Sequence, residues 1–536
     1  MVARHFAASS IVWTKSATRV WVGPWRWCVL SECILGIDAG GTSIKATLFT
    51  VGGQDIATES MLVASRKVAP GRAERDLKDI DKALVILIQG LLQKSQMNPH
   101  DIQVIAATGH GNGLYCLDRS GAGMLAIQST DTRAATLADT LANSLVGQAI
   151  AKISLQQPWP AQTPTILAAL KQSQPELYER IGTVFFCKDY INYFLTSIIS
   201  TDVTDMSGAG MLQLPETSYS DALLEHYGID ELAGSLPPLV ASDQVVGVVS
   251  ESAAGLTGLV AGTPVVAGLF DVVASAIGSG LLHEGETCVI AGTWSINEVL
   301  SSDVRRDDSP FITCGFPGGL FLNIEASATS ASNYEWLVQN VLVGPDRGPD
   351  DRERIVSALD SVLASHEASL RDPLYLPFLY GGDSDPRALA TFHNLAASHG
   401  RDHLISAVCE GITFSHRRHL DKLVEKGFPI GPIVVTGGAA RSQPWMRMLA
   451  TTLGKSVATV EAIETGTLGA AITGAVGVGI FADYPAAAKE MVGGRNEIPA
   501  NVDGISMASQ RYAMFNRLVE TLTPLWHSFP DDTVSN

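Results

Sequence analysis

Two short segments of this chain carry residue types that suit the transfer of a phosphoryl group. The first lies between two apolar runs typical of strands and reads Asp38-Ala39-Gly40-Gly41-Thr42-Ser43-Ile44-Lys45. Because glycine tolerates positive φ and leaves the backbone bare, such a hairpin lets amide N–H groups and the two hydroxyls approach phosphate oxygens closely. Lys45 adds a point charge at the far end of the turn. Asp38 either holds Mg²⁺ through water near the transferring phosphate, or caps the turn by bonding its own backbone.

The second segment places one carboxylate, Asp271, between the apolar run Gly268–Phe270 and the small-residue run Val272–Gly280. An ionised aspartate in such surroundings is costly unless it is paired, caps a helix or is functional. A sheltered carboxylate of this kind suits a general base that accepts the proton of an attacking hydroxyl. The alternative is an N-cap for the helix that follows, and both roles can coexist. A phosphate turn and a lone base together indicate phosphoryl transfer to a hydroxyl.

Two further glycine turns could border the same ligand. Gly292-Thr293-Trp294 follows an apolar run and repeats the glycine–threonine pattern of the first turn. Thr436-Gly437-Gly438-Ala439-Ala440-Arg441-Ser442 joins a predicted strand to a predicted helix. Bare backbone at such a place can approach a flat or anionic ligand at a helix N-terminus. Close packing by glycine is the alternative for this turn.

The elements that must position these segments alternate between short β-rich runs and helical ones, which indicates an α/β fold. Strands are predicted at Ile34–Ile37, Ala46–Phe49, Val104–Ala107, Pro264–Ala267, Thr287–Ala291, Leu320–Ile324 and Ile433–Thr436. Helical periodicity spans Asp79–Lys94 and Asp402–Lys426. Each glycine–threonine hairpin opens a domain-sized stretch, which predicts two similar domains that face each other, each with a phosphate-binding turn.

Composition narrows the class of protein. A chain of 536 residues exceeds one core and predicts two domains. A net charge of −18 predicts repulsion of nucleic acid and of anionic membranes, so a nucleotide site must be lined locally by N–H groups, hydroxyls and metal. Seven cysteines without a CxxC pair fit a reducing, cytoplasmic compartment. The longest uncharged stretches are interrupted by glycines, which argues against membrane spans.

Residues 1–33 differ from the rest of the chain. They contain Trp13, Trp21, Trp25 and Trp27 with several basic residues, and no acidic residue precedes Glu32. A transit or export signal is the alternative, although the segment has no clean apolar run with a small-residue cleavage site. We therefore expect a non-conforming N-terminal extension that is not part of the fold.

Taken together, these motifs resemble the FGGY family of carbohydrate kinases, which are related to the actin-like and hexokinase-like ATPases. The resemblance covers about residues 34–520 in chain order. Besides the turns above, it includes Pro70–Asp76, Ser129–Ala134, Lys188-Asp189-Tyr190, Asp205-Met206-Ser207 and Glu410-Gly411-Ile412. Within the family the chain is most similar to bacterial L-xylulose kinases, through Gly268–Val273, Gly292–Trp294, Glu325–Trp336, Leu376–Gly381 and Glu410–His416.

The resemblance implies two ribonuclease-H-like domains around a central cleft. After the extension at 1–33, it places an N-terminal domain at 34–283, which binds the sugar and supplies the base. A C-terminal domain at 284–520 would bind ATP, and residues 521–536 would form a tail.

The resemblance also implies roles for single residues, with Mg-ATP as the cofactor. Asp271 would be the base and Asp38 the magnesium ligand. The phosphates would be bound by Gly40, Gly41, Thr42, Ser43, Lys45, Gly292 and Thr293, and the adenosine bordered by Gly437, Gly438 and Ser442. His110 and Asn112 would contact sugar hydroxyls. Their segment Gly109–Gly113 departs from the Gly-Gln-Met-His-Gly of D-xylulose kinases, which puts a D-xylulose preference in doubt.

The implied reaction is phosphorylation of the terminal hydroxyl of a small sugar, either a ketopentose such as L-xylulose or a related 3-keto acid sugar. An erythritol or other polyol kinase and a non-sugar ATPase switch of the same superfamily are the alternatives. The implied partners are the sugar and ATP, and neither nucleic acid nor a membrane is an implied partner. The question of a homodimer is left open.

Overall fold

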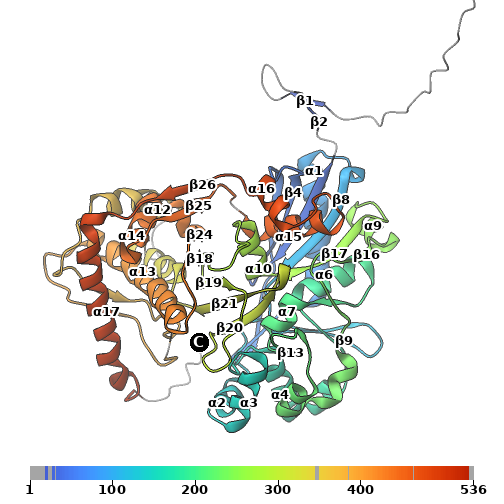
Figure 1. The fold of residues 1–536 in the computed structure, drawn as a ribbon, viewed down its shortest axis with the longest axis horizontal. Coiled ribbons are helices and arrows are strands. Elements are labelled where there is room, and N and C mark those ends of the chain that lie inside the picture. The colour runs from blue at the N-terminus through green and yellow to red at the C-terminus, as the bar shows by residue number, and fades with distance from the viewer. Residues whose placement is uncertain are drawn as a thin grey trace, which may run out of the picture.

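The structure is a computed structural model that describes residues 19–21, 27–29, 32–343, 349–383, 385–462 and 464–529. Most of the predicted extension at 1–33 and the end of the predicted tail lie outside these ranges. Within them, β1 (Arg19–Trp21) pairs antiparallel with β2 (Trp27–Val29). The rest of the chain forms two lobes side by side, each built on a mixed sheet (Figure 1). No helix in the described ranges is long and apolar enough to cross a membrane.

The first lobe is built on a six-stranded sheet. Its order is β5 (Asp55–Leu62), β4 (Ser43–Thr50), β3 (Cys33–Ala39), β8 (Ile102–Gly109), β17 (Pro264–Phe270) and β16 (Val245–Val248). Strands β3 and β4 form a hairpin, whereas β8 and β17 run parallel to β3. Ala39, Gly109 and Phe270 are in register at the ends of the parallel strands, so the residues next to them meet at one edge of the sheet.

The second lobe repeats this arrangement in a seven-stranded sheet. Its order is β20 (Ile312–Phe316), β21 (Leu320–Ser327), β19 (Ser295–Ser301), β18 (Thr287–Ala291), β24 (Ile433–Thr436), β25 (Val457–Val460) and β26 (Arg495–Ile498). Here β18 and β19 form the hairpin, while β24 and β25 run parallel to β18. The prediction of two similar domains that each open on a glycine–threonine hairpin is confirmed.

Alternate residues of the first sheet face two different cores because side chains along a strand point to opposite faces. Leu35 and Ile105 pack with α1 (Leu77–Ser95) and α6 (Cys187–Thr196) on one face. Ile34 and Val104 pack on the other face with α10 (Asp271–Gly278) and α15 (Thr465–Gly477). Helix α15 comes late in the chain but lies against the blue strands of the first lobe in Figure 1, beside α16 (Tyr484–Met491).

A smaller five-stranded sheet extends the first lobe, in the order β11 (Ile181–Phe185), β9 (Leu114–Asp118), β10 (Gly123–Ile127), β7 (Arg72–Glu74) and β6 (Arg66–Ala69). Around it lie α2 (Ala135–Ala142), α3 (Leu145–Ser154), α4 (Thr163–Ser173), α7 (Val203–Gly208) and α8 (Asp221–Tyr227), whereas α9 (Glu251–Thr257) packs against α1 and α6. The second lobe is covered by α11 (Ala331–Leu337), α12 (Pro349–Ser365), α13 (Arg401–Glu425), α14 (Gln443–Leu453) and α17 (Ile505–Trp526). All the strands and both helices predicted above are therefore present, and most extend by one to several residues beyond the predicted bounds.

Candidate active site

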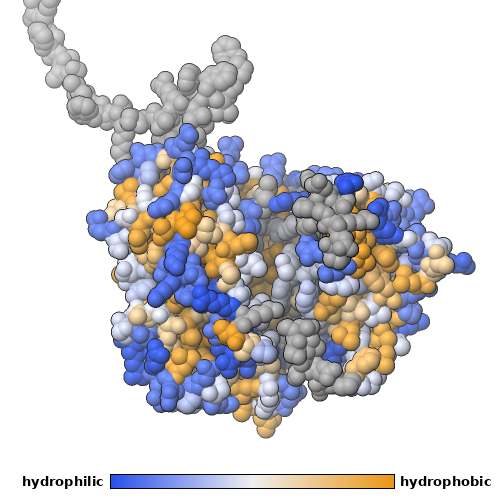
Figure 2. Space-filling view, turned by 180° about the vertical axis from the view of Figure 1, so that it is seen from behind, coloured by the Kyte–Doolittle hydropathy of each residue, from blue (hydrophilic) through white to orange (hydrophobic). Residues whose placement is uncertain are grey.

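A cavity of about 900 Å³ lies between the lobes, at the edge where the strands of the first sheet end. The molecular surface is deeply hollowed between the two halves (Figure 2). The predicted site residues on the cavity wall are Gly41, Thr42, His110, Asn112, Asp271, Gly292 and Thr293. Both lobes therefore contribute to one site.

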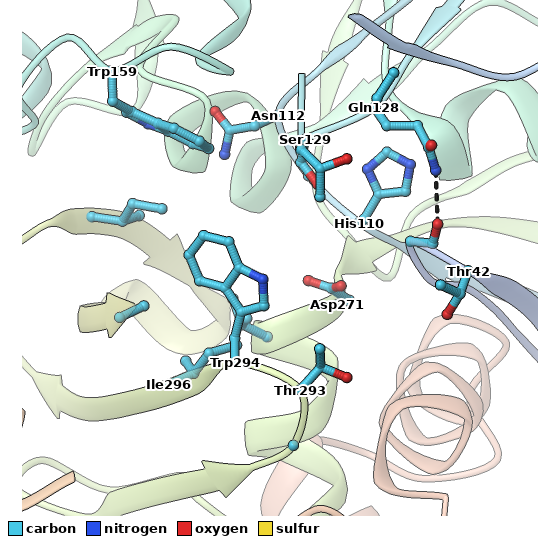
Figure 3. A pocket seen from close by; sticks show the side chains of 18 of the residues that line it. Thr42, His110, Asn112, Gln128, Ser129, Trp159, Asp271, Thr293, Trp294 and Ile296 are labelled. Atoms are coloured by element: carbon cyan, nitrogen blue, oxygen red, sulfur yellow. Dashed lines mark hydrogen bonds between the residues drawn. The ribbon is translucent and has the colours of Figure 1, made fainter. Parts of the chain in front are cut away.

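Asp271 is the first residue of α10, and its carboxylate faces the middle of the cavity (Figure 3). Burial raises its pKa to about 8, and the nearby charge of Asp38 acts in the same direction. The backbone N–H groups of Asp271 and Val272 act against this shift. A carboxyl group with a pKa near neutrality can both accept and release a proton, which is the property a general base needs.

Asp38 lies near the end of β3, and burial raises its pKa to about 6. Lys45 lowers this pKa and Glu464 raises it, while Lys45 Nζ and Glu464 Oε2 form an ion pair at 2.7 Å. Within the described ranges, Asp38 Oδ1 is buried without a hydrogen-bond partner. A Cβ on Gly466 in the first turn of α15 would lie 2.8 Å from Asp38 Oδ2. The N-termini of α10 and α15 therefore converge on this pair of carboxylates, where helix dipoles favour negative charge.

The turn between β3 and β4 is held by its carbonyl groups. Gln128 Nε2 donates to the carbonyl of Gly41 at 2.7 Å (Figure 3), and Arg75 Nη2 donates to the carbonyl of Gly40 at 3.1 Å. Among the described residues, the N–H groups of Gly41 and Thr42 donate to no protein acceptor. A turn with fixed carbonyls and free N–H groups on a cavity wall is suited to bind an anion.

The facing turn, Gly292-Thr293-Trp294, joins β18 to β19 and lies across the cavity from the first one. Gly437 supports it from behind. Its φ is +89°, and a Cβ there would lie 2.7 Å from the carbonyl carbon of Ala291 and 3.0 Å from Gly292 N. Only glycine fits both the left-handed backbone and this close approach.

The remaining part of the cavity offers polar atoms without protein partners in the described part of the chain. These are Asn112 Oδ1, an acceptor, Trp159 Nε1, a donor, and His110 Nδ1. Asn112 has a φ of 60°, and its Nδ2 donates to the carbonyl of Gly208 at 3.3 Å. His110 Nε2 is 3.2 Å from Tyr115 Oη, and burial lowers the pKa of His110 to about 3, so the ring is neutral. Buried polar atoms of this kind are available to form hydrogen bonds with a ligand such as a polyol.

Seven predicted site residues are not on the cavity wall: Asp38, Gly40, Ser43, Lys45, Gly437, Gly438 and Ser442. Lys45 pairs with Glu464, and Ser442 caps α14 by accepting from Trp445 N while its hydroxyl binds Asp360. A bound nucleotide would extend beyond this cavity, so the assignment of Gly437, Gly438 and Ser442 to adenosine stays a prediction.

Sequence reasoning missed several residues of the wall, among them Trp159 and Gln128. Trp159 lies between Pro158 and Pro160, and a tryptophan in a loop fixed by two prolines is a signal of a positioned side chain. Gln128 directly precedes the recognised segment Ser129–Ala134, but only the fold reveals that it contacts Gly41.

The donor set fits a magnesium ion that is bound mainly through phosphate oxygens. No group of three or more His, Cys, Asp or Glu in the described ranges could hold a metal ion alone. Magnesium in phosphoryl-transfer sites usually takes one or two carboxylates together with substrate phosphates and water. The unpartnered Oδ1 of Asp38 could supply such a carboxylate.

Comparison with known proteins follows the same division of the chain. The model for the FGGY family of carbohydrate kinases, N-terminal domain, matches residues 33–278, and the C-terminal domain of that family matches residues 287–478. The chain is similar to the L-xylulose/3-keto-L-gulonate kinase of Escherichia coli (strain K12), at 29% identity over 92% of this chain and 98% of that protein. It is 34% identical to the probable L-xylulose kinase of Pasteurella multocida (strain Pm70), over 84% of this chain and 91% of that protein.

Solved structures show the same similarity in three dimensions. The xylulose kinase from Rhodospirillum rubrum superposes with a TM-score of 0.82 at 25% identity, and the match covers 92% of this chain and all of that one.

Proposed function

Because this chain belongs to the FGGY family of carbohydrate kinases, it is a sugar kinase, and we propose that it transfers the γ-phosphoryl group of ATP to the terminal hydroxyl of a small keto sugar. L-Xylulose and the sugar acid 3-keto-L-gulonate are the proposed substrates, since relatives of this chain are named for them. The observation that carries the proposal is the meeting of Asp271, two glycine–threonine turns and unpartnered polar atoms in one cavity.

In the proposed reaction, Asp271 accepts the proton of the terminal hydroxyl as its oxygen attacks the γ-phosphorus and ADP departs. The free N–H groups of Gly41 and Thr42 would bind the transferring phosphoryl group, and the Gly292-Thr293 turn the diphosphate end. The protein forms no covalent bond to the phosphoryl group in this reaction, so positioning and charge neutralisation supply most of the rate enhancement.

Asn112 and Trp159 are proposed to orient the sugar. One offers an acceptor and the other a donor, so together they can hold two hydroxyls of an open-chain ketose. Asp38 is proposed to hold Mg²⁺, which neutralises phosphate charge when it is bound. Closure of the lobes would exclude water and limit wasteful ATP hydrolysis.

Release of ADP, measured with a coupled enzyme assay, tests the proposal. ATP and Mg²⁺ would be supplied with L-xylulose, 3-keto-L-gulonate, D-xylulose and erythritol in separate reactions. We expect ADP release with one of the first two sugars to exceed that with the last two. Rapid ATP turnover that no sugar or polyol stimulates would contradict the proposal and favour an ATPase switch.

A further inference from the structure

Arg72 is the only lysine or arginine among the described residues on the cavity wall. It lies in β7, whose backbone runs beside residues 128–132. Gln128 N donates to the carbonyl of Ala73 at 2.9 Å, and Thr132 N donates to that of Gly71 at 2.7 Å. Ser129 of this neighbouring segment lies on the wall near Asn112 and His110, on the far side of the cavity from Trp294 (Figure 3). Arg72 therefore belongs to the wall that faces the sugar rather than to the glycine–threonine turns.

The carboxylates near Arg72 in the chain are already paired with other residues. Glu74 and Asp131 bind Arg133, at 2.6 and 2.8 Å. Asp76 binds Arg66 at 3.1 Å. Within the described ranges no carboxylate pairs with Arg72, although the chain holds 55 acidic against 37 basic residues. Arg72 is half-buried, and its guanidinium is available to a ligand because no acidic side chain in the described ranges pairs with it.

A second arginine adds positive charge behind the same wall. Arg75 is buried, its Nε and Nη1 have no hydrogen-bond partner in the described part of the chain, and its Nη2 binds the carbonyl of Gly40. Its charge contributes to the low pKa of His110, next to the cavity. Two arginines therefore lie on or behind the sugar-facing wall, in a protein whose net charge is −18.

Building on the kinase activity proposed above, we propose that Arg72 binds the carboxylate of an acidic sugar, so that the preferred substrate class is keto sugar acids rather than neutral ketoses. The two candidate sugars share a keto group and a terminal hydroxyl. They differ in the carboxylate that 3-keto-L-gulonate carries at the end away from that hydroxyl. With the terminal hydroxyl at Asp271, the opposite end of the sugar points to the wall of Arg72. An arginine can bind such a carboxylate with two parallel hydrogen bonds.

Steady-state kinetics of Arg72 variants on the matched pair of sugars tests this assignment. Arg72→Met keeps the length of the side chain but removes its charge, and Arg72→Lys keeps the charge but loses the fork. Arg66→Met is the control, because Arg66 carries the same charge on the neighbouring strand β6 and lies outside the cavity. Melting temperatures of all three variants would be compared with that of the unmodified protein.

We expect unmodified protein to show a higher kcat/KM for 3-keto-L-gulonate than for L-xylulose. Arg72→Met should lower the value for the acid by about 10- to 100-fold, the range for a hydrogen bond to a charged group. The value for L-xylulose and the KM for ATP should stay within about threefold. Arg72→Lys should lower kcat/KM for the acid less than Arg72→Met does. Arg66→Met should leave kcat/KM for both sugars unchanged. Of the two sugars, only the acid should show a KM that rises with added salt.

Other outcomes separate this assignment from the proposed function. If L-xylulose is phosphorylated but the acid is not, Arg72 binds no carboxylate and the kinase proposal stands. An equal loss for both sugars, or a rise in the KM for ATP instead, would show that Arg72 serves the fold or the nucleotide. If neither sugar stimulates ADP release, both proposals fall together.

Discussion

At the scale of single residues, two carboxylates are kept close together in a sheltered place. Burial raises the pKa of Asp38 to about 6 and that of Asp271 to about 8, and the charge of Asp38 adds to the shift of Asp271. Because they interact, the measured values will belong to the pair rather than to either residue alone. The converging N-termini of α10 and α15 offset part of the cost of ionisation. The proposed base, Asp271, therefore has a pKa close to neutral pH.

Asp271→Asn should lower kcat by about 10²- to 10⁴-fold, because the loss of a general base has this size. The KM for the sugar should change much less. In the unmodified protein, kcat/KM should rise between about pH 6 and pH 8, since Asp271 must lose its proton before it can act. Steady-state kinetics over this pH range measures both effects. A flat pH profile, or a kcat of Asp271→Asn equal to that of the unmodified protein, would contradict the assignment of Asp271 as the general base.

The same substitution should stabilise the fold at high pH. The pKa of Asp271 lies above its usual 3.8 in the folded protein, so the folded state holds its proton more tightly than the unfolded state does. The stability that this proton confers is complete below about pH 3.8 and is lost as pH rises through about 8. Asp271→Asn should therefore raise the free energy of unfolding at pH 8 by about 2–4 kcal/mol, a value discounted because the carboxylate faces an open cavity. Urea unfolding at pH 5 and pH 8 measures this, and a gain that is equal at both pH values would contradict it.

Trp159→Phe tests a single donor in the proposed sugar site. Phenylalanine keeps an aromatic ring against Phe311, whose centroid is 5.5 Å from that of Trp159, but loses the N–H. We expect kcat/KM for the best sugar to fall by about 5- to 20-fold, with the KM for ATP unchanged, because one hydrogen bond to one ligand is lost. If both substrates respond alike, Trp159 is a packing residue.

At the scale of elements, the site depends on the crossing of α10 and α15. Each helix supplies its first turn to the carboxylate pair, and the two backbones touch through glycine. A Cβ on Gly469 would lie 1.8 Å from the carbonyl oxygen of Ala274. The ion pair between Lys45 and Glu464 and the hydrogen bond between Thr47 and Thr467 fasten α15 to β4. A displacement of either helix would therefore move Asp38 and Asp271 relative to each other.

Gly469→Ala should separate α10 from α15 and destabilise the protein by about 1–3 kcal/mol, the usual cost of overpacking. It should also lower kcat, since the carboxylate pair would be displaced. Gly90→Ala in α1 is the matched control, because a Cβ there meets nothing within 4 Å. It should stabilise α1 by about 0.5–1 kcal/mol. Thermal unfolding and steady-state kinetics would be measured for both variants. If the two variants have the same stability and the same kcat, the site does not depend on the crossing of α10 and α15.

Elements were easier to predict from the sequence than their assembly. The strands around Asp38 and Asp271 have strong apolar runs, and their glycine turns have local causes, so both were found by pattern. The contact of Gln128 with Gly41 and the packing of α15 on the first sheet join segments that are far apart in the chain. Periodicity within a segment carries no information on such contacts. The same applies to Lys45, whose predicted role in phosphate binding is untested and whose partner Glu464 no local pattern indicates.

At the scale of the whole molecule, one of the buried cores is common to both lobes. A single buried cluster joins Ile34 and Val104 of the first sheet to Cys288 and Val434 of the second, with Leu468 of α15 between them. The division into domains at 34–283 and 284–520 stays a prediction, and α15, within the second range, covers the first sheet.

Residues 32–283 produced alone should therefore be insoluble or bind a dye for exposed apolar surface. Production together with residues 284–529 should restore a soluble complex and its kinase activity, because α15 can then cover the first sheet. Circular dichroism, dye binding and ADP release would be measured on both preparations. A stable, cooperatively unfolding protein from 32–283 alone would show that the first sheet needs no cover from α15.

The place of α15 also has a consequence for how the protein is made. Strands β3 and β8 leave the ribosome long before the helix that covers them. At about 5–20 residues per second, the chain between Gly109 and Thr465 takes roughly 20–70 s to synthesise. During that interval Ile34, Val104 and Ala106 lack the helix that covers them in the finished protein. We therefore expect the nascent chain to need a chaperone at the ribosome exit, and the proposed sugar site to form only after α15 has been translated.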